Sequence, residues 1–319
     1  MRRTRIWLVV LLLLSGCVDV KTRVPPPDHR SPGIWTVLAP MLTERSEVAV
    51  AEAGGKVYVI GGFGDTFETV GTVEAYDPAQ NRWEPRTPLP VPLHHAGAVG
   101  VGGKVYVVGG FQGRVIWDTH ASLFEYDPST NAWGQRASML TPRGALGVAA
   151  IDGKIHALGG SSDRVLNVHE VYDPATNSWT RRNAMPTARD HLAVVALGGK
   201  LYAIGGRASF FGTKYVSVEI YDPANDSWQT GPPISEGRGG LAASALDGRI
   251  YVFGGELPFR VLNLTEMYEP ATNSWWVKAP MPTGRHGLGA VAVGNRIYVV
   301  SGGVRPAASR SSLNEAFEP

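Results

Sequence analysis

The chain contains a single cysteine, Cys17, and only 18% of its 319 residues are charged. One cysteine cannot form an intramolecular disulfide, so packing and hydrogen bonds have to hold the fold. Motifs typical of enzymes are also missing: we find no nucleophile elbow, no phosphate-binding glycine loop, no paired-histidine zinc motif and no calcium-binding loop. These absences exclude the enzyme classes that such motifs define, and they favour a binding protein over an enzyme.

Long apolar runs are scarce as well, and the longest one lies near the start of the chain, from Ile6 to Leu14. It is too short to span a bilayer, which takes about 20 apolar residues. Three arginines precede the run and Ser15-Gly16-Cys17 follows it, which is the layout of an export signal over residues 1–16.

The end of this signal, Leu14 to Cys17, resembles the lipobox of bacterial lipoproteins. The resemblance implies cleavage before Cys17 and a lipid on its thiol and new amino terminus, so that the lipid alone anchors the chain in a membrane. Val18 follows Cys17, and for such a sequence the resemblance implies the bacterial outer membrane, on either its periplasmic or its outer face. An ordinary secretory signal with an incidental cysteine is the alternative.

Export also changes what the charge implies. Removing the three arginines of residues 1–16 changes the formal net charge from +2 to −1. The net charge of the mature chain therefore gives no reason to expect a nucleic-acid partner. Residues 17–33 are rich in proline and lack apolar periodicity, and we expect an extended tether between the membrane and a domain over residues 34–319.

Diglycine pairs recur in the rest of the chain at intervals of 46 to 50 residues. They begin at Gly61, Gly109, Gly159, Gly205, Gly254 and Gly302. An apolar, strand-like segment precedes each pair, and Tyr-Asp-Pro or a close variant follows it. In the first five copies a tryptophan stands seven residues after that tyrosine, as in Tyr76 and Trp83. Recurrence with this period predicts a repeat architecture.

These motifs resemble those of the kelch-repeat family over residues 34–319. The resemblance implies an all-β fold, a six-bladed β-propeller of four-stranded antiparallel blades. Turn residues such as Asp152-Gly153 between two apolar runs agree with tight hairpins, and the repeated tyrosines and tryptophans are expected to fill the space between blades. Some kelch propellers are copper oxidases that need a tyrosine crosslinked to a cysteine. Because Cys17 is assigned to the lipid, that class is excluded, and we expect no cofactor.

The sixth copy stops at Phe317-Glu318-Pro319, before a fourth strand and its tryptophan. Trp35 supplies both, because ten residues separate Trp35 from Arg45, the same interval as between Trp83 and Leu93. We therefore expect the N-terminal segment to form the outer strand of the C-terminal blade and to close the ring.

Variation in length points to one face of the propeller. Nearly all of it falls in the loop between the second and third strand of each repeat, and such loops on a fixed scaffold commonly carry recognition. The connections from each fourth strand to the next first strand share that face, and five of them carry an arginine at the same position. These are Arg45, Arg143, Arg189, Arg238 and Arg285.

Two interpretations of this arginine series stay open. The guanidinium groups could line the channel mouth and bind a carboxylate or phosphate. They could also pair with a glutamate two residues before each conserved tyrosine and hold strand ends together. The one copy with Leu93 in place of arginine has Phe124 in place of glutamate. The glutamates are Glu74, Glu170, Glu219, Glu266 and Glu315.

Histidines and loop aromatics complete the candidate site. The histidines lie just past the arginine position on different blades without a metal-binding motif, so we expect no metal and consider acid–base work as their alternative role. Aromatic and basic loop residues are typical of binding hot spots. The candidates for ligand binding beside the arginine series are His95, His191, His286, Phe63, Phe111 and Arg207.

Together these features favour a monomeric lipoprotein of the cell envelope that binds a protein partner or an anionic glycan through this face. The alternative is a periplasmic sugar-modifying enzyme that resembles the sialic-acid mutarotases and epimerases. That alternative needs only acid–base groups close to an arginine that holds a carboxylate.

Overall fold

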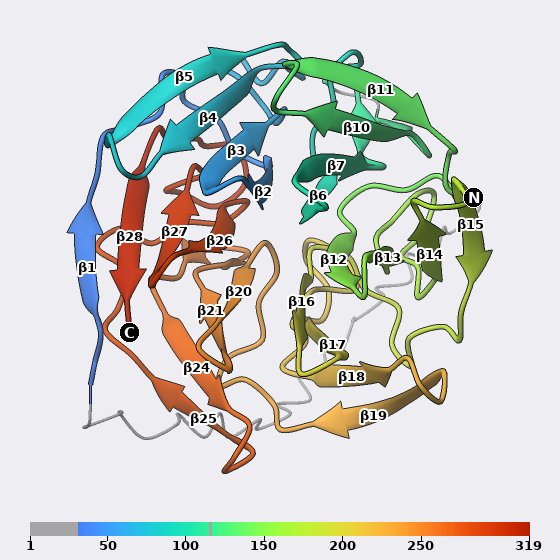
Figure 1. Ribbon diagram of the computed structural model, residues 1–319. Helices are drawn as coiled ribbons and strands as arrows, with labels where there is room; N and C mark the ends of the chain where they lie inside the picture. The colour runs from blue at the N-terminus through green and yellow to red at the C-terminus, as the bar shows by residue number, and fades with distance from the viewer. Residues whose placement is uncertain (1–30, 115–116) are drawn as a thin grey trace, which may run out of the picture.

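A computed structural model of the chain describes residues 31–114 and 117–319. These residues form six four-stranded antiparallel sheets arranged in a circle, as Figure 1 shows. This confirms the predicted six-bladed propeller. The expected export signal, the lipid on Cys17 and the tether up to residue 30 lie outside the described residues. Among the residues described, none belongs to a helix long and apolar enough to cross a membrane.

In blades 1 to 5 the chain runs from an inner strand at the central axis to an outer strand at the rim, and in blade 6 the outer strand comes from the N-terminal segment (Figure 1). Blade 1 consists of β2 (Ala49–Ala53), β3 (Lys56–Ile60), β4 (Val73–Asp77) and β5 (Arg82–Arg86). Blade 2 consists of β6 (Gly97–Val101), β7 (Lys104–Val108), β10 (Leu123–Asp127) and β11 (Ala132–Arg136). Blade 3 consists of β12 (Gly147–Ile151), β13 (Lys154–Leu158), β14 (His169–Asp173) and β15 (Ser178–Arg181).

The second half of the chain repeats this order. Blade 4 consists of β16 (Ala193–Leu197), β17 (Lys200–Ile204), β18 (Val218–Asp222) and β19 (Ser227–Gly231). Blade 5 consists of β20 (Ala242–Leu246), β21 (Arg249–Phe253), β24 (Thr265–Glu269) and β25 (Ser274–Val277). Blade 6 consists of β26 (Gly289–Val293), β27 (Arg296–Val300), β28 (Asn314–Glu318) and β1 (Ile34–Val37). Two short hairpins rise from the loops, β8 (Phe111–Gln112) with β9 (Asp118–Thr119), and β22 (Glu256–Leu257) with β23 (Arg260–Val261).

Strand β1 closes the ring by pairing with β28, as predicted. Trp35 lies opposite Phe317 in the register, and its ring also packs edge-on against Phe253 of blade 5 with centroids 5.7 Å apart. Trp35 Nε1 donates to the carbonyl of Ala279 at 2.9 Å. Pairing with β1 covers the outer edge of β28, which would otherwise be open to another chain.

The repeated tryptophans tie each blade to the one before it. Trp83 Nε1 donates to the carbonyl of Ala39 at 2.8 Å, and the equivalent indoles do the same, Trp35 included. The repeated tyrosines act within a blade: the hydroxyl of Tyr76 donates to Asn81 Oδ1 at 2.7 Å and fixes the turn between the third and fourth strands. Asn81 has a φ of +48°, a left-handed conformation that asparagine tolerates well.

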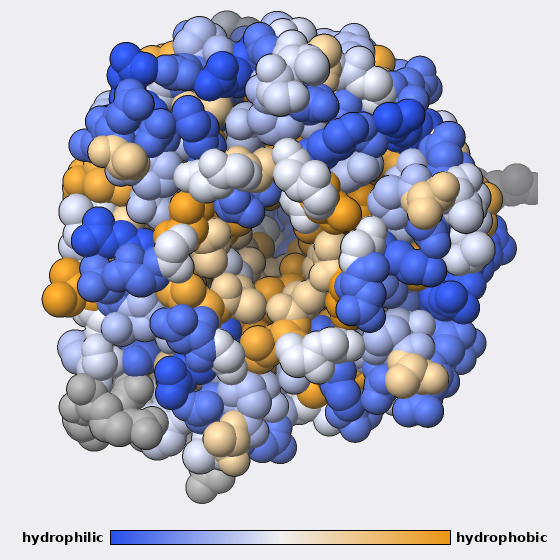
Figure 2. Space-filling view, viewed as in Figure 1, coloured by the Kyte–Doolittle hydropathy of each residue, from blue (hydrophilic) through white to orange (hydrophobic). Residues whose placement is uncertain are grey.

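The hydrophobic core consists of layers between neighbouring blades. One layer packs Tyr58 of blade 1 on Tyr126 of blade 2, with ring centroids 5.7 Å apart. At the axis the inner strands surround a channel whose walls carry small apolar residues such as Val50, Val148 and Val194. Figure 2 shows an opening at the centre of one face with apolar residues around it.

Candidate functional site

Six equivalent residues, one from each blade, form a closed ring of backbone hydrogen bonds around the axis. In each case the N–H donates to the carbonyl of the equivalent residue in the preceding blade, at 2.8 to 3.0 Å. We call them the ring positions: Glu47, His95, Ala145, His191, Gly240 and Gly287. Each lies where the connection from one blade enters the inner strand of the next.

Every ring position has a left-handed backbone, with φ between +51° and +63°. Glycine adopts this conformation freely, whereas a residue with a side chain loses about 1–2 kcal/mol. Blades 5 and 6 use glycine, but Glu47, His95 and His191 hold polar side chains at this cost. Strained residues of this kind cluster at functional sites, so these three side chains are the first candidates for function.

A pocket with a volume of about 300 Å³ lies directly over this ring. We call it the mouth pocket. Its aromatic wall consists of Phe63, Phe67, Trp117 and Phe210. Its polar floor contains Glu47, His95, His191, Arg207, Glu256 and His286. The floor residues come from five blades, which only ring closure brings together.

The aromatic wall is fixed by stacking. Phe63 stacks on His94 with centroids 4.0 Å apart, and Trp117 lies 5.9 Å from Phe63 and 5.2 Å from His95. Across the pocket, the guanidinium of Arg207 lies over the ring of Phe210 at 5.2 Å. Such a wall suits the apolar face of a sugar ring or of a flat side chain.

Arg207 organises the polar floor. Its Nη1 donates to Glu256 Oε1 at 2.8 Å, its Nε to Asp190 Oδ1 at 3.2 Å, and its Nη2 to His191 Nε2 at 2.8 Å. Since Nε2 of His191 accepts here, its Nδ1 carries the hydrogen and donates to Asp190 Oδ1 at 2.8 Å. Burial would raise the pKa of Asp190, but the neighbouring His191 and Arg207 hold it below its ordinary value.

His94 and His95 lie side by side at the base of the aromatic wall, where burial disfavours their charged forms. Burial lowers the pKa of His94 to about 3 and lowers that of His95 well below its ordinary value, with His191 adding to the effect. The Nδ1 atoms of the two rings lie 2.6 Å apart. One ring therefore donates to the other, and His95 Nε2 faces Glu47 Oε2 at 3.2 Å.

The arginine series lies away from this pocket. All five guanidinium groups are buried, and each pairs with the glutamate of its own blade. The distances are 3.4 Å for Arg45–Glu74, 2.8 Å for Arg143–Glu170, 2.9 Å for Arg189–Glu219, 2.7 Å for Arg238–Glu266 and 2.6 Å for Arg285–Glu315. Of the two interpretations left open above, the geometry therefore supports the paired one, and these side chains are unavailable to a ligand.

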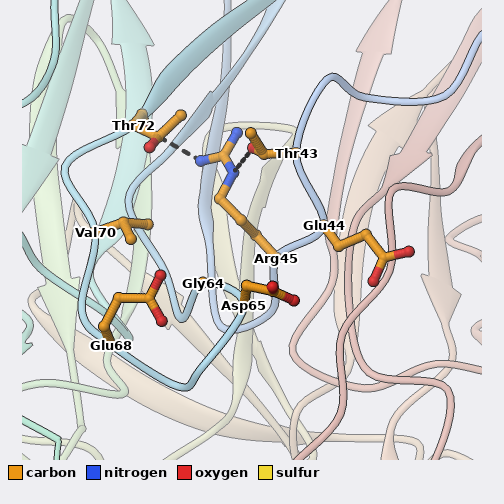
Figure 3. A pocket seen from close by; sticks show the side chains of 8 residues that line it. All are labelled: Thr43, Glu44, Arg45, Gly64, Asp65, Glu68, Val70 and Thr72. Carbon is orange, nitrogen blue, oxygen red and sulfur yellow. Dashed lines mark hydrogen bonds between the residues drawn. The ribbon is translucent and has the colours of Figure 1, made fainter.

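Figure 3 shows this arrangement around Arg45, in a separate cleft of about 380 Å³ in blade 1. The guanidinium turns toward Thr43 and the backbone oxygen of Thr72, away from the carboxylates of Asp65 and Glu68. Burial lowers the pKa of Arg45 to about 10 against the opposing effect of Glu74.

Blade 2 replaces the ion pair by an apolar contact. Leu93 and Phe124 are both buried and belong to the same hydrophobic cluster between blades 1 and 2. The joint replacement seen in the sequence thus has a physical reason: either partner alone would leave a buried charge unpaired.

The other predicted residues converge only in part. His95, His191, His286, Phe63 and Arg207 line the mouth pocket. Phe111 does not; it is buried behind the wall, 5.4 Å from the ring of Trp117. His286 Nε2 donates to the carbonyl of Ala307 at 3.0 Å, and its buried Nδ1 has no hydrogen-bond partner.

Sequence reasoning missed Glu256. It follows the diglycine of blade 5 directly, as Arg207 does in blade 4, and both form an isolated bridge with the incoming connection. In blade 6 the residue at this position is Gly303, because Ser301-Gly302 has the backbone conformation of Gly61-Gly62. The sixth diglycine is therefore offset by one residue from the other five, and the position equivalent to Glu256 is a glycine in blade 6.

Comparison with known proteins places this architecture among kelch propellers. The family described as "KLHDC2/KLHL20/DRC7 Kelch-repeats domain" matches residues 34–185, and "Kelch motif" matches residues 188–235 and 237–282. The chain is 38% identical over 65 residues to "Kelch-like protein 21" of Danio rerio, covering 20% of the chain and 11% of that protein. It is 38% identical over 85 residues to "Kelch-like protein 4" of Homo sapiens, covering 27% of the chain and 10% of that protein.

The chain thus spans about a tenth of the length of these curated relatives. Among solved structures, "Structure of YjhT" superposes with a TM-score of 0.76 at 17% identity, over 88% of this chain and 96% of the other. At this level of identity the similarity shows a common fold alone.

Proposed function

Because the chain belongs to the kelch-repeat family, whose domains generally mediate protein interactions, we propose that it is a binding module of the bacterial cell envelope. Its ligand is a protein partner or an anionic glycan that inserts a ring-sized group into the mouth pocket. The lipid on Cys17 and the outer-membrane location are part of this proposal and rest on the sequence of residues 1–17.

The observation that carries the proposal is the joining of an aromatic wall to a polar floor within one pocket of about 300 Å³. Pockets that bind small groups are mostly apolar and carry a few fixed polar side chains that set orientation. Phe63 and Trp117 offer the apolar surface, and Arg207 is held by two carboxylates in one orientation. Arg114 lies at the rim, where it can pair with an acidic group of the ligand.

Exposed aromatic residues around the pocket suit the larger contact that a protein partner would make. Phe211 and Phe259, in the loops of blades 4 and 5, are 77% and 88% exposed. Aromatic side chains of this kind are enriched among the residues that dominate binding energy. The mouth pocket would then hold the central anchor of the partner.

Glycan arrays and pull-down from envelope extracts test this proposal directly. We expect retention of at least one glycan or envelope protein, with weaker retention at high salt if an acidic group contacts Arg114. Blank arrays and blank pull-downs, together with turnover of a small sugar, would contradict it.

A sugar-modifying enzyme is the second candidate, and one observation favours it. Asp190 accepts from His191 Nδ1 and so orients an imidazole toward the pocket, close to the carboxylate of Glu47. A histidine oriented by a carboxylate can transfer protons. NMR measurement of anomerisation of acidic sugars tests this candidate; interconversion no faster than in buffer would eliminate it.

A further inference from the structure

Three potential metal-ligand atoms lie close together near the axis. They belong to the side chains of Glu47, His95 and His191. The ligand atoms of the three residues all lie within 4.8 Å of one another. They come from three different blades, so no sequence motif links them. The ring of backbone hydrogen bonds holds all three in place.

The hydrogen bonds of His94 decide which nitrogen of His95 faces this cluster with a lone pair. His94 Nε2 lies 3.2 Å from the carbonyl of Gly113, which can only accept, so this nitrogen carries the hydrogen. With the hydrogen of His94 on Nε2, its Nδ1 is the acceptor, and the hydrogen between the two rings belongs to His95 Nδ1. Consequently His95 Nε2 is an acceptor, and it faces Glu47 Oε2 at 3.2 Å.

Two acceptors at this distance repel each other unless they share a proton or bind one metal ion. His191 adds a third lone pair, because its Nδ1 hydrogen is used by Asp190. A carboxylate that orients a histidine through the nitrogen remote from the metal is the usual outer-shell partner at metal sites. Asp190 has this role here, because it accepts from Nδ1 of His191.

We propose that Glu47, His95 Nε2 and His191 Nε2 bind one divalent first-row transition-metal ion at the floor of the mouth pocket. Two imidazoles and one carboxylate suit zinc or iron(II) and leave further coordination positions open. The remaining ring positions are Ala145, Gly240 and Gly287, which bring no competing ligand. The open positions therefore face the channel and the pocket.

The charges of the floor are compatible with a dication. Three carboxylates and one guanidinium are paired around the cluster, so the formal charge of these four groups is −2. They belong to Glu47, Asp190, Glu256 and Arg207. Arg207 Nη2 donates to His191 Nε2. Metal binding replaces that hydrogen bond, while Glu256 and Asp190 retain Arg207 through its other nitrogens.

This inference goes beyond the proposed function and does not depend on it, since metal binding is measured without any ligand. The experiment uses the full chain, stripped with a chelator and titrated with Zn²⁺ by calorimetry. Co²⁺ serves as a spectroscopic probe of the coordination sphere in a parallel titration. We expect one ion per chain and visible cobalt bands of a nitrogen- and oxygen-bound site.

Substitutions at the ligands locate the ion. His95→Ala, His191→Ala and Glu47→Gln are each expected to weaken Zn²⁺ binding by at least about 100-fold, and Asp190→Asn by about 10- to 100-fold. His156→Tyr, a buried histidine remote from the pocket, serves as the control and should leave the affinity unchanged. Melting curves check that each variant is folded.

A matched pair of glycine variants tests the geometry without removing a ligand. A Cβ at Gly287 would lie 2.4 Å from Glu47 Oε1, so Gly287→Ala should displace the carboxylate and weaken Zn²⁺ binding about 10-fold or more. A Cβ at Gly240 meets only Gly287 and His286, so Gly240→Ala should not. Ala145 shows that this backbone accepts alanine.

Two results would overturn the proposal. One is the absence of Zn²⁺ and Co²⁺ binding below millimolar concentration in the folded wild-type chain, which would mean that a proton alone lies between His95 and Glu47. The other is stoichiometric binding that His95→Ala and His191→Ala leave intact.

Discussion

His95 contacts Glu47 twice: its backbone N–H donates to the carbonyl of Glu47 at 3.0 Å, and its Nε2 lies 3.2 Å from the carboxylate of the same residue. The first contact joins blades 1 and 2 at the axis, and the second places a functional pair at the floor of the mouth pocket. The hydrogen-bonded ring that closes the propeller therefore also builds the site. A substitution that disturbs ring closure should therefore also change the geometry of the mouth pocket.

Removal of residues 34–37, the whole of β1, tests closure. We expect the melting temperature to fall for the entire domain, because β28 loses its outer partner and Phe253 and Phe317 lose contact with Trp35. Trp35→Ala alone should cost about 2–4 kcal/mol, as for large-to-small changes in a core. Val37→Thr, at a position 68% exposed, is the control. An unchanged melting temperature after the deletion would refute closure by β1.

The stability lost by breaking a buried ion pair should return when both of its residues are replaced by apolar ones. Arg143→Leu leaves Glu170 buried without its partner and should destabilise the protein by about 3–5 kcal/mol in denaturant unfolding. The double variant Arg143→Leu/Glu170→Phe copies Leu93 and Phe124 of blade 2, and most of the loss should be recovered. If the double variant were less stable than the single one, the proposed equivalence of the two arrangements would be wrong.

Acid should destabilise the blade 3–4 interface through two buried histidines. His156 Nδ1 and His169 Nε2 lie 2.9 Å apart, and burial lowers their pKa values from 6.5 to about 4 and about 3. The unfolded chain then binds more protons than the folded one below pH 6.5. Stability is thus full above that value and declines as the pH falls from 6.5 toward 4.

The variant His156→Tyr/His169→Val isolates this effect, because it copies Tyr58 and Val73 of blade 1. We expect its free energy of unfolding to depend less steeply on pH over that window than that of the wild type. Equal slopes would show that the two histidines do not contribute.

The proposed lipid anchor has its own test. In cells labelled with a fatty acid, the wild-type chain should incorporate label and sediment with the outer membrane. Cys17→Ser should remain unlabelled and unprocessed. Label retained by Cys17→Ser would place the lipid elsewhere, and soluble, processed wild-type chain would favour the ordinary secretory signal.

The fold was predictable because each blade repeats its own local chemistry. A diglycine, a Tyr-Asp-Pro turn and a tryptophan mark the strands of a repeat, and the shortfall after Phe317 pointed to Trp35. The tryptophan that completes the pattern donates to the preceding blade just as Trp83 does. Local signals suffice here because a propeller is built from neighbouring contacts.

The site was only partly predictable because it depends on convergence across blades. The sequence predicted Arg143 and His95 near the same face, but only His95 is available to a ligand. Arg143 is buried in an ion pair with Glu170, whereas His95 lines the mouth pocket. Glu256 follows its diglycine as Arg207 does, but the sequence does not show that the two side chains meet across blades 4 and 5. Which side chains meet at the axis depends on how the blades close into a ring and on the rotamer of each side chain. The spacing of motifs within one repeat specifies neither.

The most direct test of the central claim compares ligand retention by three forms of the chain on the same glycan array and envelope extract. They are the wild type, the pocket variant Phe63→Ala/Trp117→Ala and the control variant Val37→Thr on the outer strand β1, whose side chain is 68% exposed and outside the pocket. The account predicts that the pocket variant stays folded and loses retention at least about 10-fold, while the control variant keeps most of it. Full retention by the folded pocket variant would contradict the claim that the mouth pocket is the functional site.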